Sequence, residues 1–173
     1  VWKKIPIGGS EASLMTSLLD VKIYQANMKH YNELYDRDKK TRTYIYPSAL
    51  KFLLLGKIKV SLEPIETEFA CLPYVYINPN NEKRRLREVL DNAYLAKFGL
   101  ELCRAVDALW LRLASTDQLE GEQLLVGSEL LAQKNSYGLL LGLMRVEESA
   151  VFVELFETFC IMDQTKFIFR IKK

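Results

Sequence analysis

Two carboxylates near the end of the chain are the first residues whose type and spacing could do chemistry. Glu154 and Glu157 lie three residues apart in the apolar stretch VFVELFETF. If this stretch is a helix, side chains at that spacing lie on one face. Carboxylate oxygens are the ligands that Mg²⁺ prefers, so the pair could belong to a metal site. The alternatives are the remnant of such a site and a solvated helix edge.

Other residue types that often do chemistry are sparse. The chain has one histidine, His30, and three cysteines, Cys71, Cys103 and Cys160, with no C-x-x-C pair. This set argues against a zinc site and against a disulfide framework, and we expect the cysteines to be small core residues. A Ser-His or Cys-His hydrolase would have to be built around His30. The sequence contains neither a G-x-S-x-G motif nor a glycine-rich phosphate loop.

The composition is that of a globular protein. The chain has 173 residues, 49% of them hydrophobic, and a net charge of +2. Such a small charge gives no overall basic field, so nucleic-acid binding would need local basic clusters. No apolar run reaches the roughly 18 residues that span a membrane. The N-terminal residues do not resemble a signal peptide, and the earlier removal of a targeting peptide stays open.

The elements that must position the carboxylates come late in the chain. All five prolines precede residue 80, and long helical patterns follow Asn81. We therefore predict a boundary there, with an N-terminal α/β extension over 1–81 and a mainly α domain over 82–173. In the extension we expect a helix over 11–36, short strands at TYIYP and KIKVSLEP, a short helix after Pro47 and an extended piece at CLPYVYINPNN.

Three motifs follow one another in the region predicted to be helical. They are AKFGLELCR (96–104), LEGEQLLVGSELLAQKNSYGLLLGL (119–143) and SAVFVELFETF (149–159). In this order they resemble the signature helix, the E-G-x-L-T helix and the last helix of the ribonuclease III catalytic domain. The resemblance covers about residues 86–164. It implies a mainly α, ribonuclease III-like all-helical domain, and no double-stranded-RNA-binding domain follows it.

Ribonuclease III enzymes hold Mg²⁺ with four acidic positions, and the resemblance implies which residues stand there. Glu101 and Glu154 stand where the family has aspartates, Glu157 matches the last glutamate, and Lys97 replaces the signature glutamate. A lysine removes an oxygen ligand and puts positive charge where the cation would bind. We therefore expect a pseudoenzyme with no catalytic residues and no bound metal. Mg²⁺ would be a cofactor only if the chain is an active nuclease.

Basic and aromatic residues give a separate hint of RNA contact. Arg84, Arg85 and Arg87 follow one another in EKRRLREV, and arginine binds phosphate bidentately. The alternative is an ordinary charged helix start. Four tyrosines could stack on bases, although the buried face of short strands is the commoner role: Tyr44, Tyr46, Tyr74 and Tyr76. Trp110 lies in an apolar helical stripe and is expected to pack in the core.

The resemblance and the lost glutamate together favour a non-catalytic structural subunit of an RNA–protein assembly. Similar degenerate domains belong to the large subunit of the mitochondrial ribosome. This implies a ribosomal protein of the mitochondrial matrix. Its expected partners are ribosomal or other structural RNA and protein subunits, including a second ribonuclease III-like domain. No membrane is expected as a partner. Two alternatives remain open: an active mini-ribonuclease III-type endoribonuclease, and a helical protein–protein adaptor unrelated to RNA.

Overall fold

The structure, a computed structural model, describes most of the C-terminal half of the chain and parts of the N-terminal half. The described residues are 1–9, 42–45, 64–79, 86–115, 117–130, 133–134, 137–147, 150–157 and 164–173. Their strands are β1 (Lys3–Ile7), β2 (Arg42–Ile45), β3 (Ile65–Pro73), β4 (Leu100–Glu101), β5 (Gln123–Val126), β6 (Gln133–Lys134), β7 (Tyr137–Glu147), β8 (Ala150–Glu157) and β9 (Lys166–Ile171). Their helices are α4 (Tyr74–Ile77), α5 (Leu86–Val89), α6 (Asn92–Leu95), the 3-10 turn η2 (Ala96–Phe98) and α7 (Asp107–Ala114).

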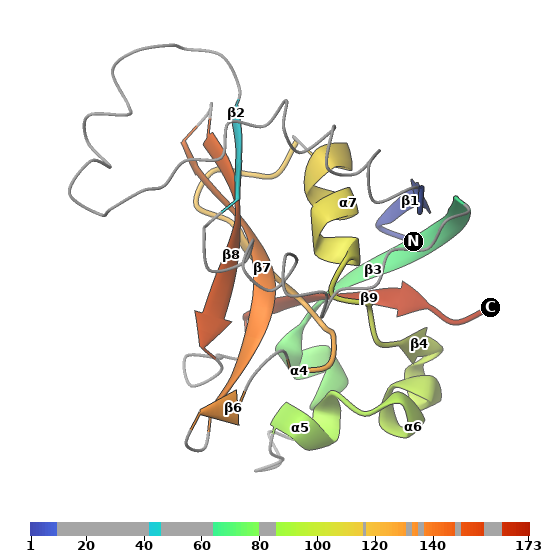
Figure 1. Cartoon of the computed structure of the whole chain (residues 1–173). Coiled ribbons are helices and arrows are strands. Elements are labelled where there is room, and N and C mark those ends of the chain that lie inside the picture. The colour runs from blue at the N-terminus through green and yellow to red at the C-terminus, as the bar shows by residue number, and fades with distance from the viewer. Residues whose placement is uncertain are drawn as a thin grey trace.

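All the described strands belong to one curled, mixed sheet that forms a half-barrel. Its order is β1-β3-β9-β5-β7-β8-β2, with β4 beside β9 and β6 beside β7. β5 pairs in parallel with β9, and β2 pairs in parallel with β8, while the other pairs are antiparallel. Figure 1 shows α7 on one side of this sheet and α4, α5 and α6 on the other.

This architecture overturns the predicted fold class. The region 82–173 is not a ribonuclease III-like all-helical domain, because it contributes most of a sheet. The motif LEGEQLLVGSELLAQKNSYGLLLGL contains β5, β6 and the first part of β7, and SAVFVELFETF contains β8 rather than a helix. The physical reason is that a strand buried on both faces reads as a continuous apolar run, which periodicity cannot separate from a buried helix.

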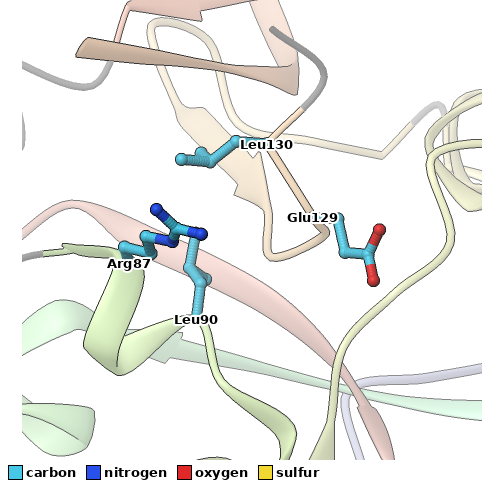
Figure 2. A pocket seen from close by; sticks show the side chains of 4 residues that line it. All are labelled: Arg87, Leu90, Glu129 and Leu130. Carbon is cyan, nitrogen blue, oxygen red and sulfur yellow. The ribbon is translucent and has the colours of Figure 1, made fainter. Parts of the chain in front are cut away.

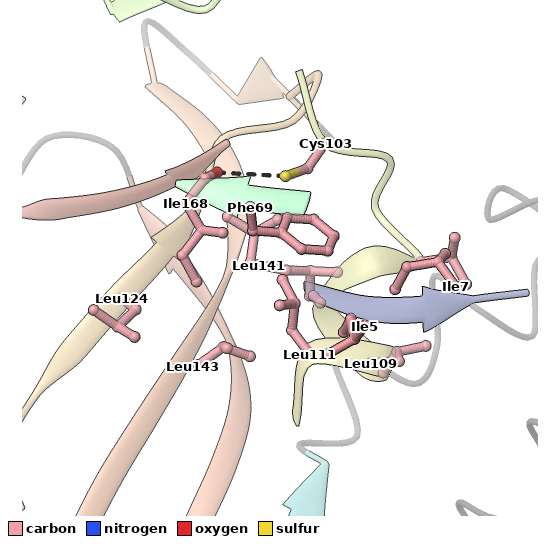
Figure 3. Packing of buried hydrophobic residues seen from close by; sticks show 13 residues of the cluster. Ile5, Ile7, Phe69, Cys103, Leu109, Leu111, Leu124, Leu141, Leu143 and Ile168 are labelled. Carbon is pink, nitrogen blue, oxygen red and sulfur yellow. Dashed lines mark hydrogen bonds between the residues drawn. The ribbon is translucent and has the colours of Figure 1, made fainter. Parts of the chain in front are cut away.

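The central strands show this burial on both faces. Phe167 and Phe169 of β9 pack with α5 and α6 in one apolar cluster, while Ile168 between them packs with α7 in another. Neighbouring strands divide their residues in the same way, because side chains alternate across a strand. Figure 3 shows the α7 side, where the thiol of Cys103 donates a hydrogen bond to the carbonyl oxygen of Ile168 at 3.4 Å.

Strands from both sides of the boundary predicted at Asn81 pair in this sheet. β3 pairs with β9, placing Cys71 opposite Ile168, and β1 pairs with β3. The boundary itself stays a prediction. The strand predicted at TYIYP is confirmed in part as β2, and the piece CLPYVYINPNN instead ends β3 and forms α4. The helix predicted over 11–36, the helix after Pro47 and nearly all of the strand KIKVSLEP lie outside the described residues.

Candidate nucleic-acid interface

Lys97 and Glu101, two of the four positions that the resemblance assigned to a vestigial metal site, do not share a helix. Lys97 lies in η2, which ends at Gly99 with a φ of 69°, and Glu101 lies in β4. The change of direction at Gly99 removes the helical face that the four-residue spacing predicts. No ion pair joins Lys97 to Glu101 in this part of the chain.

Glu154 and Glu157 lie on another strand. β8 is separated from β9, the partner of β4, by β5 and β7. Two intervening strands put the backbones of β4 and β8 on the order of 10 Å or more apart. Positions three apart in a strand also fall on opposite faces, so the shared face expected of a helix does not apply. The structure therefore divides the four positions between a 3-10 turn and two separate strands.

The described residues offer little for metal or nucleophilic chemistry. Over the ranges given above, no three His, Cys, Asp or Glu side chains converge on a point where a metal ion could bind. His30 and Cys160 lie outside those ranges. Burial raises the pKa of Cys71 to about 11 and raises that of Cys103 well above its ordinary value. Both thiols are therefore protonated near neutral pH and are poor nucleophiles.

Two buried charged groups serve the fold. Asp107, fully buried at the start of α7, accepts two hydrogen bonds from Arg170, at 2.6 and 2.8 Å, and one from the backbone N–H of Arg104. Arg112 is 1% exposed; its guanidinium donates to Gln118 Oε1 at 2.7 Å and to the carbonyl oxygen of Ser115. Burial lowers the pKa of Arg112 to about 10. These contacts anchor α7 at both ends, to β9 and to the following loop.

Arg87 is the only one of the three predicted RNA-binding arginines within the described residues; Arg84 and Arg85 lie outside them. Arg87 lies in α5 and lines a pocket of about 320 Å³ together with Leu90, Glu129 and Leu130. Figure 2 shows the Arg87 guanidinium beside Leu90 and facing Leu130, while the carboxylate of Glu129 points away from these three side chains. Arg87 is thus available to a ligand at the surface.

An aromatic and basic cluster on α6 and η2 was not among the predicted sites. The Lys97 Nζ lies 5.4 Å from the centre of the Tyr94 ring, and the Phe98 ring meets Tyr94 edge-on at 5.4 Å between centroids. We name Tyr94, Lys97 and Phe98 the Tyr94 cluster. Phe98 is 40% exposed. The sequence carried a signal for it, because residues at spacings of three and four lie on one helical face.

Hydrogen bonds fix the Tyr94 cluster firmly. The carboxylate of Asp91 caps α6 by accepting the backbone N–H of Tyr94 at 2.9 Å, and the Tyr94 hydroxyl donates to the carbonyl oxygen of Ile77 at 2.6 Å. The backbone N–H of Lys172 donates to the carbonyl oxygen of Gly99 at 3.0 Å, which brings the exposed Lys172 close to η2. The result is a rigid surface with exposed ring and ammonium groups.

The predicted base-stacking tyrosines divide between core and surface. Tyr74 packs on the buried Phe167 at 5.8 Å between ring centroids, as the structural alternative predicts. Tyr76, two residues on in α4, is 65% exposed. Tyr44 lies in β2, and Tyr46 lies outside the described residues. Only Tyr76 of this set therefore offers a described, exposed ring.

Comparisons with protein-family models, with curated proteins and with solved structures return no match. Within the described ranges, no helix has the length and hydropathy needed to cross a bilayer.

Proposed function

We propose that this protein is a non-catalytic, RNA-contacting subunit of an RNA–protein assembly. The Tyr94 cluster is the observation that carries the proposal. It presents the partly exposed ring of Phe98 beside the ammonium of Lys97, on a surface that hydrogen bonds hold in place. Rings that stack on bases, next to cations that contact the phosphates, are the usual means of binding single-stranded RNA.

Charge and position strengthen this reading. Lys97 and Lys172 are exposed, and the Lys172 backbone is bonded to Gly99 directly after η2. Arg87 lies on α5, which packs against α6. Since the whole chain carries only +2, RNA would be drawn to this local concentration of cations and not to the protein at large.

The finer proposals made from the resemblance lose their support. The mitochondrial ribosome, the second ribonuclease III-like domain as a dimer partner and the nuclease alternative all depended on a helical domain, and the described region is a sheet. Location in the mitochondrial matrix stays an untested prediction. The adaptor alternative, binding a protein and no RNA, becomes one of the outcomes of the test below.

The test is RNA binding by fluorescence anisotropy, with a single-stranded oligouridine of about ten nucleotides. We expect Phe98→Ala to weaken binding roughly tenfold, because stacking on a ring contributes about 1–3 kcal/mol per base. Lys97→Gln should weaken binding and reduce the slope of log K against log salt concentration by about 0.7, the value for one phosphate contact on a single strand.

Two matched variants control for non-specific effects. Leu119→Ala removes another exposed apolar side chain, which is 70% exposed on the loop before β5, and Lys4→Gln removes another lysine, on β1. Both should bind oligouridine as the wild type does. Absence of binding by the wild type, or equal losses in the control variants, would overturn the proposal and favour the adaptor. Mg²⁺-dependent cleavage of the RNA would contradict the non-catalytic part.

A further inference from the structure

The segment 92–102, which carries the Tyr94 cluster, has little regular structure to hold its shape. It consists of the four-residue helix α6, the three-residue turn η2, a reversal of direction at Gly99 and the two-residue strand β4. Helices this short are unstable in water by themselves. Contacts at the ends of the segment must therefore fix the position of η2 and of the side chains that η2 presents.

Asn92 joins the two ends of this segment. Its side-chain oxygen Oδ1 accepts a hydrogen bond from the backbone N–H of Leu102 at 2.9 Å, across ten residues of chain. The backbone on either side of Leu102 is bonded to the sheet, because β4 pairs with β9 and the N–H of Cys103 donates to the carbonyl oxygen of Gly127 at 2.8 Å. Asn92 thus ties the start of α6 to a part of the chain that the sheet already holds.

The side chain of Asn92 takes no part in the apolar core. It is exposed, while Leu95 and Leu100 bury the apolar face of the same segment at 0% and 4% exposure. An exposed hydrogen bond contributes little to the stability of a domain, but it restricts the conformations of the loop that it closes. The position of Asn92 therefore suits the orientation of η2 better than the folding of the chain.

We propose that Asn92 is a positioning residue of the RNA-contacting surface. Its bond to Leu102 fixes η2, and η2 then holds the ring of Phe98 and the ammonium of Lys97 in place for a base and a phosphate. A surface ordered in advance loses less entropy when it binds. This proposal rests on the proposed function, and it adds that the affinity for RNA depends on a side chain that acts through Phe98 and Lys97.

The experiment is a double-mutant cycle of Asn92→Ala with Phe98→Ala in the oligouridine assay. We expect Asn92→Ala to weaken binding about threefold in the wild-type background, the size expected for the entropy of ordering one side chain at an interface. In the Phe98→Ala background it should have little further effect, because the ring that it positions is gone. A general loosening of the fold would weaken binding equally in both backgrounds. Ala93→Ser, at the neighbouring exposed position of α6, should bind as the wild type does.

Amide hydrogen exchange without RNA measures the bond itself. The Leu102 amide should exchange roughly tenfold faster in Asn92→Ala than in the wild type, because local opening then exposes it to water more often. The Cys103 amide, which is bonded to Gly127, should keep its wild-type rate. Equal exchange of the Leu102 amide in the two proteins would show that Asn92 does not close the loop and would overturn the proposal.

The outcomes separate the role of Asn92 from the function on which it rests. If the wild type binds oligouridine and Asn92→Ala binds equally well, the positioning role is overturned and the RNA-contacting function stands. The same conclusion follows if Asn92→Ala weakens binding equally with and without the ring of Phe98. Absence of binding by the wild type overturns both proposals.

Discussion

Gly127, directly after β5, is a position where the packing leaves no room for a side chain. A Cβ added there would lie 2.6 Å from Cδ1 and 2.8 Å from Cζ of Phe169, and closer still to Cε1. The backbone cannot easily retreat, because the Gly127 N–H donates to the Ile168 carbonyl oxygen at 2.9 Å and its own carbonyl oxygen accepts from Cys103 at 2.8 Å. Gly127→Ala should therefore displace the ring of Phe169.

The ring has little free space. Phe169 is fully buried and stacks on Phe167 at 5.9 Å between centroids. Overpacking a well-packed core costs about 1–3 kcal/mol, and we expect Gly127→Ala to lie near the upper end of this range. That is a large share of the roughly 5–15 kcal/mol typical of a domain. Phe169→Leu alone should cost about 2 kcal/mol through lost packing.

The decisive measurement is a double-mutant cycle by urea denaturation. Combined with Phe169→Leu, the methyl group of Gly127→Ala enters space that the ring has left, so the two losses should fall short of additivity by about 2 kcal/mol. Gly99→Ala is the matched control. Gly99 has a φ of 69°, and a Cβ added to it would meet no atom within 4 Å, so its cost of about 1 kcal/mol is backbone strain alone. The cost of Gly99→Ala and the cost of Phe169→Leu should be additive in the double mutant. If the costs of Gly127→Ala and Phe169→Leu are additive too, the steric argument is refuted.

Three further predictions concern named contacts. Asp107→Asn should lower the free energy of unfolding by about 3–5 kcal/mol, because it leaves the partly buried guanidinium of Arg170 without a counter-charge. If urea denaturation gives a loss under about 1 kcal/mol, the ion pair does not anchor α7. Asp91→Ala should cost about 1 kcal/mol by removing the cap on the Tyr94 N–H, and a melting temperature equal to wild type would contradict this. Burial raises the pKa of Cys71 from 9.0 to about 11, so the unfolded thiol ionises first and stability should fall as pH rises from 9 to 11. Denaturation across that range should show a steeper fall in wild type than in Cys71→Ala, where the buried Cys103 still contributes its own fall, and parallel curves would disprove the contribution of Cys71.

The sequence predicted local features better than the sheet. The helical stripe around Trp110 is confirmed in α7, where Trp110 packs against the apolar cluster, and Cys103 is a core residue as expected. A helix that is covered on one face has apolar residues at spacings of three and four, and this spacing can be read from the sequence alone. The short strand β2 was found from its aromatic and β-branched residues for a similarly local reason.

The prediction failed where tertiary contacts decide the conformation. β7 contains the run GLLLGLM, and leucine prefers a helix in isolation. In the structure Leu140 packs on one side of the sheet while Leu141 and Leu143 pack on the other, with α7. A strand covered on both faces has no polar alternation to reveal it. The same error made Glu154 and Glu157 look like neighbours on one helical face, and it led to the wrong prediction of a mainly α domain.

The fold also explains why the proposed RNA contacts lie where they do. The central strands β9, β5 and β7 are covered on both faces, by α7 on one side and by α4, α5 and α6 on the other, so many of their side chains are committed to the core. Binding groups must then come from the covering layer. α5, α6 and η2 are three or four residues long. α5 and α6 bury one apolar side chain each and η2 buries none, so most of their side chains are at least partly exposed. Tyr94 illustrates the division within one residue, because its hydroxyl binds the Ile77 carbonyl oxygen while its ring meets Lys97 and Phe98. A short covering layer anchored in this way can present base-binding groups without disturbing the sheet beneath it.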